Sequence, residues 1–538
     1  MKSNKNILSG PPFARKWNYK SVGDYYLKTV PQHGSATALI SMETGEELTH
    51  KQLLENSLKL AKALEKQGLR LNDRIGICSE NNLNFAIAAF SSIFLGTTIC
   101  PLSPFYTERE LIHTMKISKP TYIFVSISCL PRMKKIVKDL PWSTNLILLQ
   151  PNLSNSEIPN ISGLISKIPN SESRNFRLPE IDIENHVLLI SASSGTTGLP
   201  KGVMLTHKNI LTMIQQYDEC KVPVTRVNGT MLGLMPFSHA YGFCLLMTVF
   251  AFGATQIIIS KFEENIFLKA IEKYRIQVLN LAPPLLVFLA KSPIVDKYDL
   301  SSVTRVSSGA APLSVEIEEA VKKRFKLPFI RNSYGLTETT LGVLYVPDNF
   351  KKGSIGILHL GVSAKVVPLD GISKEALGPN CEGELCFKGD NIMKGYCLDE
   401  KATKAAIDED GFLHTGDVGY YDEDGYFFII DRVKELIKYK GFQVPPAELE
   451  SILLTHPKIR DAAVVGLPDE FAGELPLAFV VKKAGVQIRA EEIIKYVNER
   501  VSPQKRLRGG VRFIEAIPKN PSGKILRREL RNLLKSKL

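Results

Sequence analysis

The stretch from residue 191 to residue 202 reads Ser191-Ala192-Ser193-Ser194-Gly195-Thr196-Thr197-Gly198-Leu199-Pro200-Lys201-Gly202. The apolar run 187–190 stands before it and is short enough to predict a buried strand. Glycines let a backbone approach a bulky anion, and N–H groups, hydroxyls and an ammonium together hold phosphate oxygens. The stretch therefore predicts a strand that leads into a phosphate-binding loop.

The spacing of this loop differs from the Walker A pattern, Gly-x4-Gly-Lys-Ser/Thr. Pro200 stands five residues after Gly195, and Lys201 is followed by Gly202 rather than by a serine or threonine. A plain flexible loop is the alternative for a Ser/Gly-rich stretch, but the strand before the loop argues against it. The sequence thus indicates a phosphate site on a scaffold other than a P-loop.

Further stretches carry side chains that suit nucleotide chemistry. In residues 331–340, the ring of Tyr334 can stack on adenine, and the carboxylate of Glu338 suits Mg²⁺. Asp417 ends the stretch 411–417, and an ionised Asp can accept hydrogen bonds from two ribose hydroxyls. His239 lies in an uncharged, aromatic-rich loop, where a histidine is more often a core residue than a functional one.

Taken together, these stretches resemble the adenylate-forming superfamily, which includes acyl-CoA synthetases, 4-coumarate–CoA ligases and beetle luciferases. The similar motifs run in the family's order from about residue 45 to the C-terminus, and residues 447–453 and 507–511 are particularly similar to the luciferase branch. The resemblance implies an enzyme that uses ATP, Mg²⁺ and CoA to activate a carboxylate.

The resemblance also implies roles for individual residues. Glu338 would hold the metal. Lys524 would bridge carboxylate, α-phosphate and ribose, and His239 would line the acyl carboxylate site. Lys438 and Gln443 would act when a small domain reorients between half-reactions. The nucleotide would be bound by Ser193, Ser194, Gly195, Thr196, Thr197, Gly198, Lys201, Gly309, Ala310, Ala311, Tyr334, Gly335, Thr337, Asp417 and Arg432, and the acyl group by His239, Ala240, Tyr241, Gly309, Gly335, Leu336 and Leu341.

Departures from the luciferase pattern bear on the substrate. Leu341 stands where luciferases generally carry serine, and Ala310 where firefly enzymes often have glycine. An arginine usually found upstream of the histidine motif has no clear counterpart near Cys220-Lys221. These changes are similar to those of non-luminous, luciferase-like fatty acyl-CoA synthetases, which implies a medium- to long-chain fatty acid as substrate.

Three other functions stay open at this point. The first is a beetle-type luciferase, which adenylates luciferin and then uses O₂. The second is a 4-coumarate-type aromatic acid–CoA ligase. The third is a non-catalytic nucleotide- or acyl-binding protein that keeps the fold. The presence of Lys201, Glu338, Asp417 and Lys524 together argues against the third.

The chain of 538 residues is too long for one core, so it should form at least two domains. Alternating helix and strand patterns predict an α/β protein whose large N-terminal domain contains doubly wound sheets and a β-subdomain. A small, mobile α+β domain should follow. We expect the large domain over residues 1–430, a hinge at 431–434, and the small domain, with Lys438 and Lys524, over 435–538.

The pattern also predicts individual elements. In the large domain we expect an amphipathic helix over 48–70, a strand over 74–78, a buried helix over 84–95 and a strand over 426–430, with 151–183 as a surface connection. In the small domain, helices are expected over 447–454 and 490–501, and strands over 462–465, 477–481 and 511–514.

Composition limits the partners and the compartment. The net charge of +13 (68 basic against 55 acidic residues) favours anionic partners, but no nucleic-acid-binding pattern accompanies it. The long uncharged stretches 81–107 and 231–260 contain prolines, glycines and polar residues, so we expect no transmembrane segment. The eight cysteines are scattered without a Cys-x-x-Cys pair, which predicts neither disulfides nor a zinc site. The terminal Ser536-Lys537-Leu538 predicts recognition by the peroxisomal import receptor.

Overall fold

The computed structural model describes residues 6–151, 157–193, 200–220, 226–310, 313, 315–369, 375–432, 435–440, 442–469, 471–501, 503–519 and 523–535, without the side chains of Gln443 and Lys535. Some predicted features lie outside these residues. They are the centre of the phosphate loop (Ser194, Gly195, Thr196, Thr197, Gly198), Ala311, the hinge residues Val433 and Lys434, and the terminal Ser536–Leu538.

The first large sheet carries the two strands that flank the phosphate loop. Its strands lie in the order β19-β9-β8-β5-β4-β6-β7, and β5, β4, β6 and β7 run parallel. The predicted strand at 74–78 is β4 and begins and ends where expected. The bounds are β4 (Arg74–Cys78), β5 (Thr98–Leu102), β6 (Tyr122–Val125), β7 (Asn145–Leu148), β8 (Val187–Ser193), β9 (Lys201–Thr206) and β19 (Gly395–Tyr396).

The second large sheet has the order β14-β13-β12-β10-β11-β2-β3, with parallel pairing from β14 to β2. Parallel strands need crossover connections, and helices supply them here. The bounds are β2 (Thr37–Ser41), β3 (Glu47–Thr49), β10 (Thr230–Gly233), β11 (Thr255–Ile258), β12 (Val278–Leu281), β13 (Arg305–Ser308) and β14 (Arg331–Asn332).

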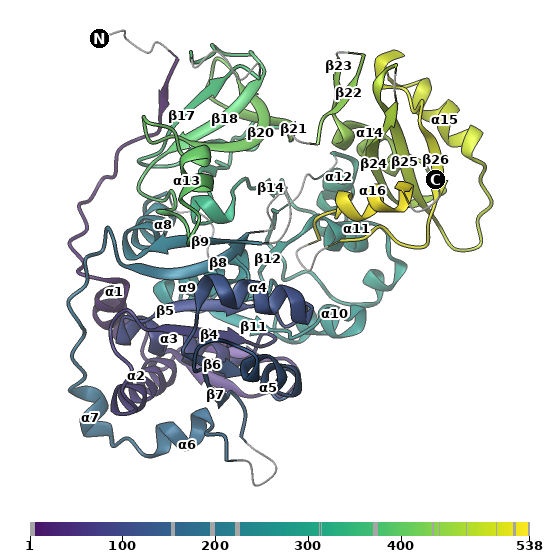
Figure 1. Ribbon diagram of the computed structural model, residues 1–538. Helices are drawn as coiled ribbons and strands as arrows, with labels where there is room; N and C mark the ends of the chain where they lie inside the picture. The colour runs from purple at the N-terminus through teal and green to yellow at the C-terminus, as the bar shows by residue number, and fades with distance from the viewer. Residues whose placement is uncertain are drawn as a thin grey trace.

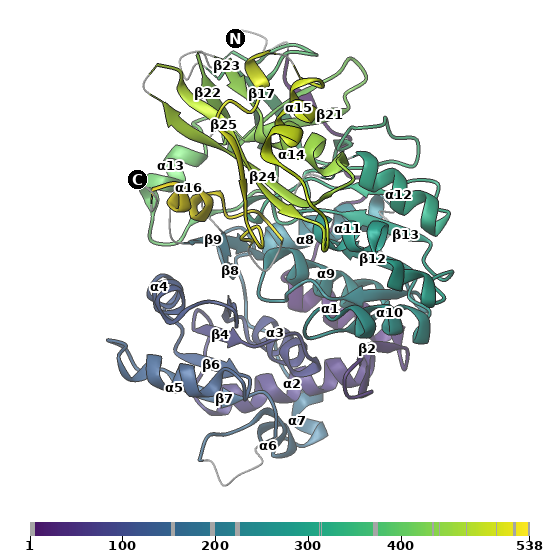
Figure 2. The same cartoon turned by 90° about the vertical axis from the view of Figure 1, so that its right-hand side faces the viewer.

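Helices fill the space between the two sheets and cover their outer faces (Figures 1 and 2). Helix α3 (Leu83–Leu95) contacts β4 and β5 of the first sheet and β2 of the second. Its sequence carries apolar residues on all faces, so the helix can be enclosed between the sheets. The other helices of the two large sheets are α1 (Val22–Thr29), α2 (His50–Lys66), α4 (Glu108–Ser118), α5 (Leu130–Lys138), α8 (His207–Glu219), α9 (Ala240–Phe252), α10 (Glu264–Lys273), α11 (Pro283–Lys291) and α12 (Val315–Phe325).

Helix α2 shows how local sequence sets the ends of an element. Thr49 and Gln52 form a reciprocal capping box at its start. The helix was expected over 48–70 but ends at Lys66, because Gly68 follows with φ +99°. The expected surface connection at 151–183 contains two short helices among its described residues, α6 (Ile161–Ser166) and α7 (Asn170–Arg174). The side chain of Asn160 caps the start of α6, and such a cap cannot be recognised from the spacing of apolar residues.

A smaller antiparallel sheet forms the β-subdomain, green in Figure 1. Its order is β1-β17-β18-β20-β21, and it brings the two ends of the large domain together because β1 pairs with β17. The bounds are β1 (Leu8–Ser9), β17 (Ser363–Val367), β18 (Gly383–Lys388), β20 (Leu413–Tyr421) and β21 (Phe427–Arg432), with helix α13 (Glu400–Ala406) and the hairpin β15 (Leu344–Tyr345) and β16 (Ile357–Leu358) nearby in sequence.

The C-terminal part, yellow-green to yellow in Figure 1, has its own sheet and its own apolar cores. The sheet runs β23-β22-β25-β24, with β26 parallel to β25, so helices and a mainly antiparallel sheet make the predicted α+β unit. The bounds are β22 (Ile437–Tyr439), β23 (Phe442–Val444), α14 (Pro446–Thr455), β24 (Ile459–Asp469), β25 (Gly473–Lys482), α15 (Ala490–Asn498), β26 (Gly510–Phe513) and α16 (Arg527–Lys535).

Candidate functional site

The predicted site residues gather where several strands end. Strands β10, β12, β13 and β14 are parallel, and their carboxyl ends lead into the stretches around His239, Ala282, Gly309 and Tyr334. In open α/β sheets, ligands bind outside the carboxyl ends of parallel strands. The topology therefore brings together motifs that lie about one hundred residues apart in the sequence.

The two ends of the phosphate loop are held opposite each other. Ser193 at the end of β8 and Lys201 at the start of β9 are cross-strand partners. The Ser193 hydroxyl donates a hydrogen bond to Oε1 of Glu338 over 2.9 Å, which ties the loop to the predicted metal ligand. Carboxylate and hydroxyl oxygens at the end of a phosphate loop fit Mg²⁺, so Glu338 is suited to hold the ion beside ATP phosphates.

Tyr396 completes this end of the site and was not predicted from the sequence. Its hydroxyl donates to Oε1 of Glu338 over 3.0 Å, and Nζ of Lys201 lies 4.5 Å from the centre of its ring. Tyr396 belongs to the two-residue strand β19, which pairs with β9 from almost two hundred residues away. A strand of two residues has no periodicity, so no local signal could have identified it.

Asp417 lies at the other end of the site, where the antiparallel register is irregular. Glu384 pairs with Val418, whereas Cys386 pairs with His414, so residues 415–417 form a bulge in β20. Nε of Arg432 lies 2.9 Å from Oδ1 of Asp417, and the Tyr334 hydroxyl donates to Oδ2 over 2.7 Å. Each carboxylate oxygen keeps a second lone pair, so Asp417 can still accept from ribose hydroxyls.

The hydrogen bond from the Tyr334 hydroxyl to Asp417 thus holds the Tyr334 ring in place. Burial, followed by the charge of Asp417, raises the pKa of Tyr334 well above its usual range, so the hydroxyl stays a donor. Its ring centre lies 6.0 Å from that of Phe387. The predicted adenine-stacking residue and the predicted ribose pair are therefore one hydrogen-bonded unit.

Lys524 comes from the small domain but lies beside this unit. Burial, and then the neighbouring guanidinium of Arg432, lowers the pKa of Lys524 to about 8, while Asp417 and Glu435 oppose the shift. Gly523 before it has φ +83°, and a Cβ there would lie 3.0 Å from Cγ of Pro284 at the start of α11. Glycine thus lets the loop with Lys524 pass close to the large domain.

His239 precedes α9 and is half-buried, with its Nε2 shielded from solvent. Among the described residues its Nε2 has no hydrogen-bond partner, and burial lowers its pKa to about 4, so the imidazole is neutral near pH 7. A buried ring nitrogen without a partner fits a polar ligand group such as a carboxylate oxygen. The neighbouring Ala240 is buried. The side chain of Tyr241 lies close to Gly309, since a Cβ added to Gly309 would lie 3.6 Å from the Tyr241 hydroxyl.

Residues 334–341 fold back on themselves to form a tight turn. A Cβ on Gly335 would lie 1.5 Å from the carbonyl oxygen of Leu341, so only glycine fits there. Thr340 and Leu341 have φ of +50° and +86°, and such strained backbone is often found at functional sites. Thr337 begins a short 3₁₀ helix with Glu338, and the backbone N–H of Leu336 donates to Oγ1 of Thr339.

The remaining predicted residues lie at the edge of this arrangement or outside it. Ala310 is exposed and has φ +70°, a conformation that glycine adopts without strain. Lys438 is exposed on β22, with Gln443 as its cross-strand partner in β23, so the structure brings these two together. Asp431, the first residue of the predicted hinge, is still part of β21, and its Oδ2 accepts from the backbone N–H of Ala447 in α14.

In the described part of the chain, no helix combines the length and the apolar character needed to cross a membrane.

Comparisons with known proteins agree with this geometry. Residues 27–397 match the family described as AMP-binding enzyme, and residues 448–524 match the AMP-binding enzyme C-terminal domain. The chain is 42% identical to luciferin 4-monooxygenase of Photuris pensylvanica, covering 99% of this chain and 100% of that one. It is 39% identical to 4-coumarate–CoA ligase 1 of Petroselinum crispum, covering 94% and 93%.

Solved structures support the fold. ATP-bound MatB from Rhodopseudomonas palustris superposes with a TM-score of 0.86 at 23% identity, covering 96% of this chain and 99% of that one. For apo MatB, with the same identity and coverage, the TM-score is 0.74. Both structures therefore share the fold of this chain.

Fold and site together define an adenylate-forming enzyme. The chain belongs to the AMP-binding enzyme family. This assignment confirms the predicted superfamily, the α/β fold with a separate C-terminal domain, and the cofactors ATP, Mg²⁺ and CoA.

Proposed function

We propose that the chain is an ATP-dependent fatty acyl-CoA synthetase, which converts a medium- to long-chain carboxylate, ATP and CoA into acyl-CoA, AMP and pyrophosphate. The observation that carries the proposal is the position of Lys524. It lies beside Asp417 of the large domain and Arg432 of the predicted hinge, and the same large domain carries a phosphate end built from Ser193, Glu338 and Lys201.

In the first step, a carboxylate oxygen attacks the α-phosphorus of ATP and the bond to the bridging β-phosphate oxygen breaks. Pyrophosphate leaves, and an acyl-adenylate remains. Lys201 and the loop would hold the departing phosphates, Glu338 would hold Mg²⁺, and the ammonium of Lys524 would lie where negative charge develops. The neutral His239 can donate a hydrogen bond that orients the carboxylate.

In the second step, the CoA thiolate attacks the acyl carbon, the bond to the phosphate oxygen breaks, and AMP leaves. Lys524 serves only the first step, so the small domain has to reorient between the two. Lys438 is exposed on β22 and is available for contacts in the second arrangement, and Gln443 is its cross-strand partner in β23. Closure of either arrangement would exclude water, which would otherwise hydrolyse the adenylate.

The choice of a fatty acid rests on the turn that contains Leu341. Its side chain is half-buried and packs against the main apolar core, together with Tyr241 and Tyr334. An aliphatic side chain here offers no hydrogen bond to a polar acyl group but can contact methylene groups. Each buried methylene stabilises a complex by about 0.8 kcal/mol, so chain length should affect affinity strongly.

The proposal is tested by following AMP release with fatty acids of increasing length, cinnamates and luciferin, each with and without CoA. We expect CoA-dependent AMP release that is greatest with medium to long chains. Leu341→Ser should lower kcat/KM for these chains several-fold, and Leu533→Ser on the exposed part of α16 should leave it unchanged. If no acid gives CoA-dependent AMP, the ligase activity is refuted.

Luciferase activity is the second candidate, because the similarity to luciferin 4-monooxygenases spans nearly the whole chain. Strong light emission with luciferin, ATP and O₂ would reverse the ranking of substrates. The similarity to 4-coumarate–CoA ligases supports a third, and higher kcat/KM with cinnamates than with fatty acids would establish it.

We also propose import into peroxisomes through Ser536-Lys537-Leu538, provided that Leu538 carries the free carboxy terminus of the protein. A fluorescent protein fused ahead of this chain should collect in peroxisomes. The same fusion without residues 536–538 should remain diffuse, and an unchanged distribution would refute the proposal.

A further inference from the structure

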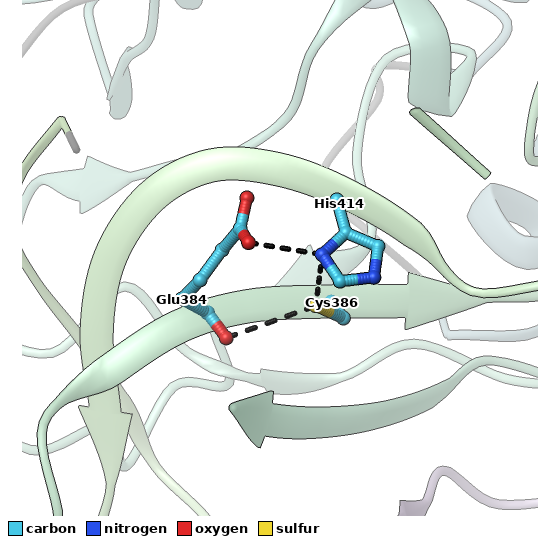
Figure 3. Close-up of side chains that lie close together, drawn as sticks. All are labelled: Glu384, Cys386 and His414. Atoms are coloured by element: carbon cyan, nitrogen blue, oxygen red, sulfur yellow. Dashed lines mark hydrogen bonds and ion pairs between the residues drawn. The ribbon is translucent and has the colours of Figure 1, made fainter. Parts of the chain in front are cut away.

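The β-subdomain contains a cluster of potential metal ligands that the adenylation chemistry does not use. Glu384 and Cys386 are two residues apart on β18, and His414 is the cross-strand partner of Cys386 in β20. Their side chains lie together, as Figure 3 shows, and the three potential ligand atoms lie within 4.8 Å of one another. The sequence spacing gave no hint of this cluster, because His414 lies 28 residues beyond Cys386.

The distances in the cluster fit a tetrahedral ion. Zn²⁺ binds thiolate sulfur at about 2.3 Å, and nitrogen and oxygen at about 2.0–2.2 Å, so tetrahedral angles place S and N about 3.6 Å apart and N and O about 3.3 Å apart. Sγ of Cys386 lies 3.5 Å from Nδ1 of His414, and Oε2 of Glu384 lies 2.9 Å from the same nitrogen. Sγ of Cys386 and the Glu384 carboxylate lie within 4.8 Å of each other, against about 3.6 Å in a tetrahedral site, so a side-chain movement of up to about 1 Å would complete the geometry.

The surroundings of His414 match those of a metal-binding histidine. Such a histidine almost always donates its second ring N–H to a carboxylate or carbonyl. Nε2 of His414 lies 3.5 Å from Oδ2 of Asp408, which leaves Nδ1 directed at Glu384 and Cys386. Asp408 is in turn held by Nζ of Lys365 over 2.6 Å and by the backbone N–H of Phe412.

We propose that Glu384, Cys386 and His414 bind a borderline-soft divalent cation such as Zn²⁺, at a site separate from the Mg²⁺ site at Glu338. One nitrogen, one sulfur and one oxygen ligand suit Zn²⁺, whereas Mg²⁺ requires oxygen ligands. The side chains of His414 and Glu384 are 30% and 21% exposed, so an ion can enter from solvent, although Cys386 is fully buried.

Binding of the ion would release two protons from its ligands. Burial raises the pKa of the Cys386 thiol well above its usual range, and the hydrogen bond that Nδ1 of His414 donates to the Glu384 carboxylate raises the pKa of His414. A thiol and a protonated imidazole cannot bind a metal, so the ion replaces the proton on Sγ and the proton on Nδ1, and both pass to the buffer. No electron transfer is involved.

The site lies at the base of the bulge that presents Asp417 to the nucleotide. Oε1 of Glu384 accepts from the backbone N–H of Gly416 over 2.8 Å, while Oε2 is directed at His414. An ion bound to Oε2 leaves the Gly416 contact in place. We therefore expect the ion to stabilise this bulge rather than to disrupt it.

The test uses the full-length protein, stripped of metals and kept reduced, with excess Mg²⁺ present. Zn²⁺ is titrated in competition with a chromogenic chelator. We expect the unaltered protein to bind one equivalent of Zn²⁺ at least tenfold more tightly than Cys386→Ala or His414→Gln does. Loss of a residue that only orients a ligand weakens metal binding by about 10- to 100-fold, and loss of one of three ligands should weaken it at least as much. The matched control is Cys381→Ala, because Cys381 is exposed and lies outside the cluster.

A second measurement is independent of how well the variants fold. Co²⁺ added to the unaltered protein should give a thiolate-to-cobalt charge-transfer band in the near ultraviolet, and this band should persist in Cys381→Ala and disappear in Cys386→Ala. Absence of the band in the unaltered protein, or equal Zn²⁺ affinity in Cys386→Ala, His414→Gln and the control, would overturn the proposal and leave a purely structural Glu384–His414 pair.

Discussion

Lys524 shows how a single charge depends on residues from distant parts of the chain. It is half-buried beside Arg432, and burial, followed by that guanidinium, lowers its pKa, while Asp417 stabilises the charged form. An anionic ligand between these groups would compensate the repulsion between Lys524 and Arg432. The residue is therefore poised to interact with negative charge that appears on phosphate oxygens.

Replacing Lys524 should separate the two half-reactions. Lys524→Ala is expected to slow adenylation by at least a hundredfold, since a group of this kind contributes about 3 kcal/mol to transition-state stabilisation. Thioester formation from pre-made acyl-AMP should be nearly unchanged. Pyrophosphate release and acyl-CoA formation measure the two steps, with Lys495→Ala on the exposed side of α15 as the control. Equal loss of both steps would contradict the assigned role.

The pH dependence of adenylation should follow the same ammonium. Because the pKa of Lys524 is lowered to about 8, the charged form is present below pH 8 and is lost as the pH rises through that value. We expect kcat/KM for pyrophosphate release to fall about tenfold per pH unit above pH 8. Lys524→Arg, which stays charged, should remove this decline even if its rate is lower. A profile of the unaltered protein that is flat up to pH 10 would contradict the prediction.

Tyr396 offers a second test at this scale. Tyr396→Phe removes the hydrogen bond to Glu338 but keeps the ring beneath Lys201. A hydrogen bond to a charged group is worth about 1.5–3 kcal/mol, so kcat/KM for Mg·ATP should fall roughly 10- to 100-fold. The matched control, Tyr420→Phe in β20, should behave like the unaltered protein. Unchanged kinetics of Tyr396→Phe would mean that Glu338 is positioned without it.

Among the elements, the turn over residues 334–341 is the least tolerant of change. It has to bring the backbone of Gly335 against the carbonyl of Leu341, and two successive residues adopt positive φ to achieve this. Asn391 reinforces the turn, since its Nδ2 donates to the carbonyl oxygens of Thr339 and Gly342. Tyr334 and Glu338 keep their places because this backbone is fixed.

Gly335→Ala should therefore damage both stability and activity. The added Cβ would lie 1.5 Å from a backbone oxygen, and overpacking of this kind costs about 3 kcal/mol. Urea denaturation and adenylation rate measure the two effects. Gly378→Ala is the control, because a Cβ there has no neighbour within 4 Å and the residue has no positive φ. Near-native stability of Gly335→Ala would show that the turn can open.

At the scale of the whole molecule, the large and small domains have separate apolar cores, joined by β21 and the residues that follow it. Asp431 accepts from Ala447 in α14, and Lys291 of α11 donates to the carbonyl of Leu454 over 3.3 Å. Polar contacts of this kind between two separate apolar cores are compatible with the reorientation proposed for the small domain.

Separate cores predict separate unfolding. Glu450 is buried and accepts two hydrogen bonds from Arg527, over 2.7 and 2.8 Å, within the small domain. Arg527→Met leaves that carboxylate unpaired, which should cost about 3–5 kcal/mol. In calorimetry we expect a lower transition temperature for the small domain alone. Arg489→Met, at an exposed ion pair, should change little. An equal shift of one common transition would refute independent cores.

Local sequence accounts for much of the fold. Strand β4 was predicted at its exact bounds, and the predicted helix over 84–95 begins one residue earlier as α3, because periodicity and caps lie within a few residues of each other. The helix predicted over 48–70 was too long, since apolar spacing continued past the glycine that ends it. The helices α6 and α7 were missed because they are shorter than two turns.

The sequence by itself determined the family and the order of its two domains, and it gave the residues proposed for the phosphate loop and the site, because each of these motifs consists of neighbouring residues. Only the tertiary structure decided that Tyr396 holds Glu338, that Lys524 lies beside Asp417, and that Glu384, Cys386 and His414 meet. Those contacts arise from strand pairing and domain packing across tens to hundreds of residues, which depend on burial over the whole chain and leave no local pattern.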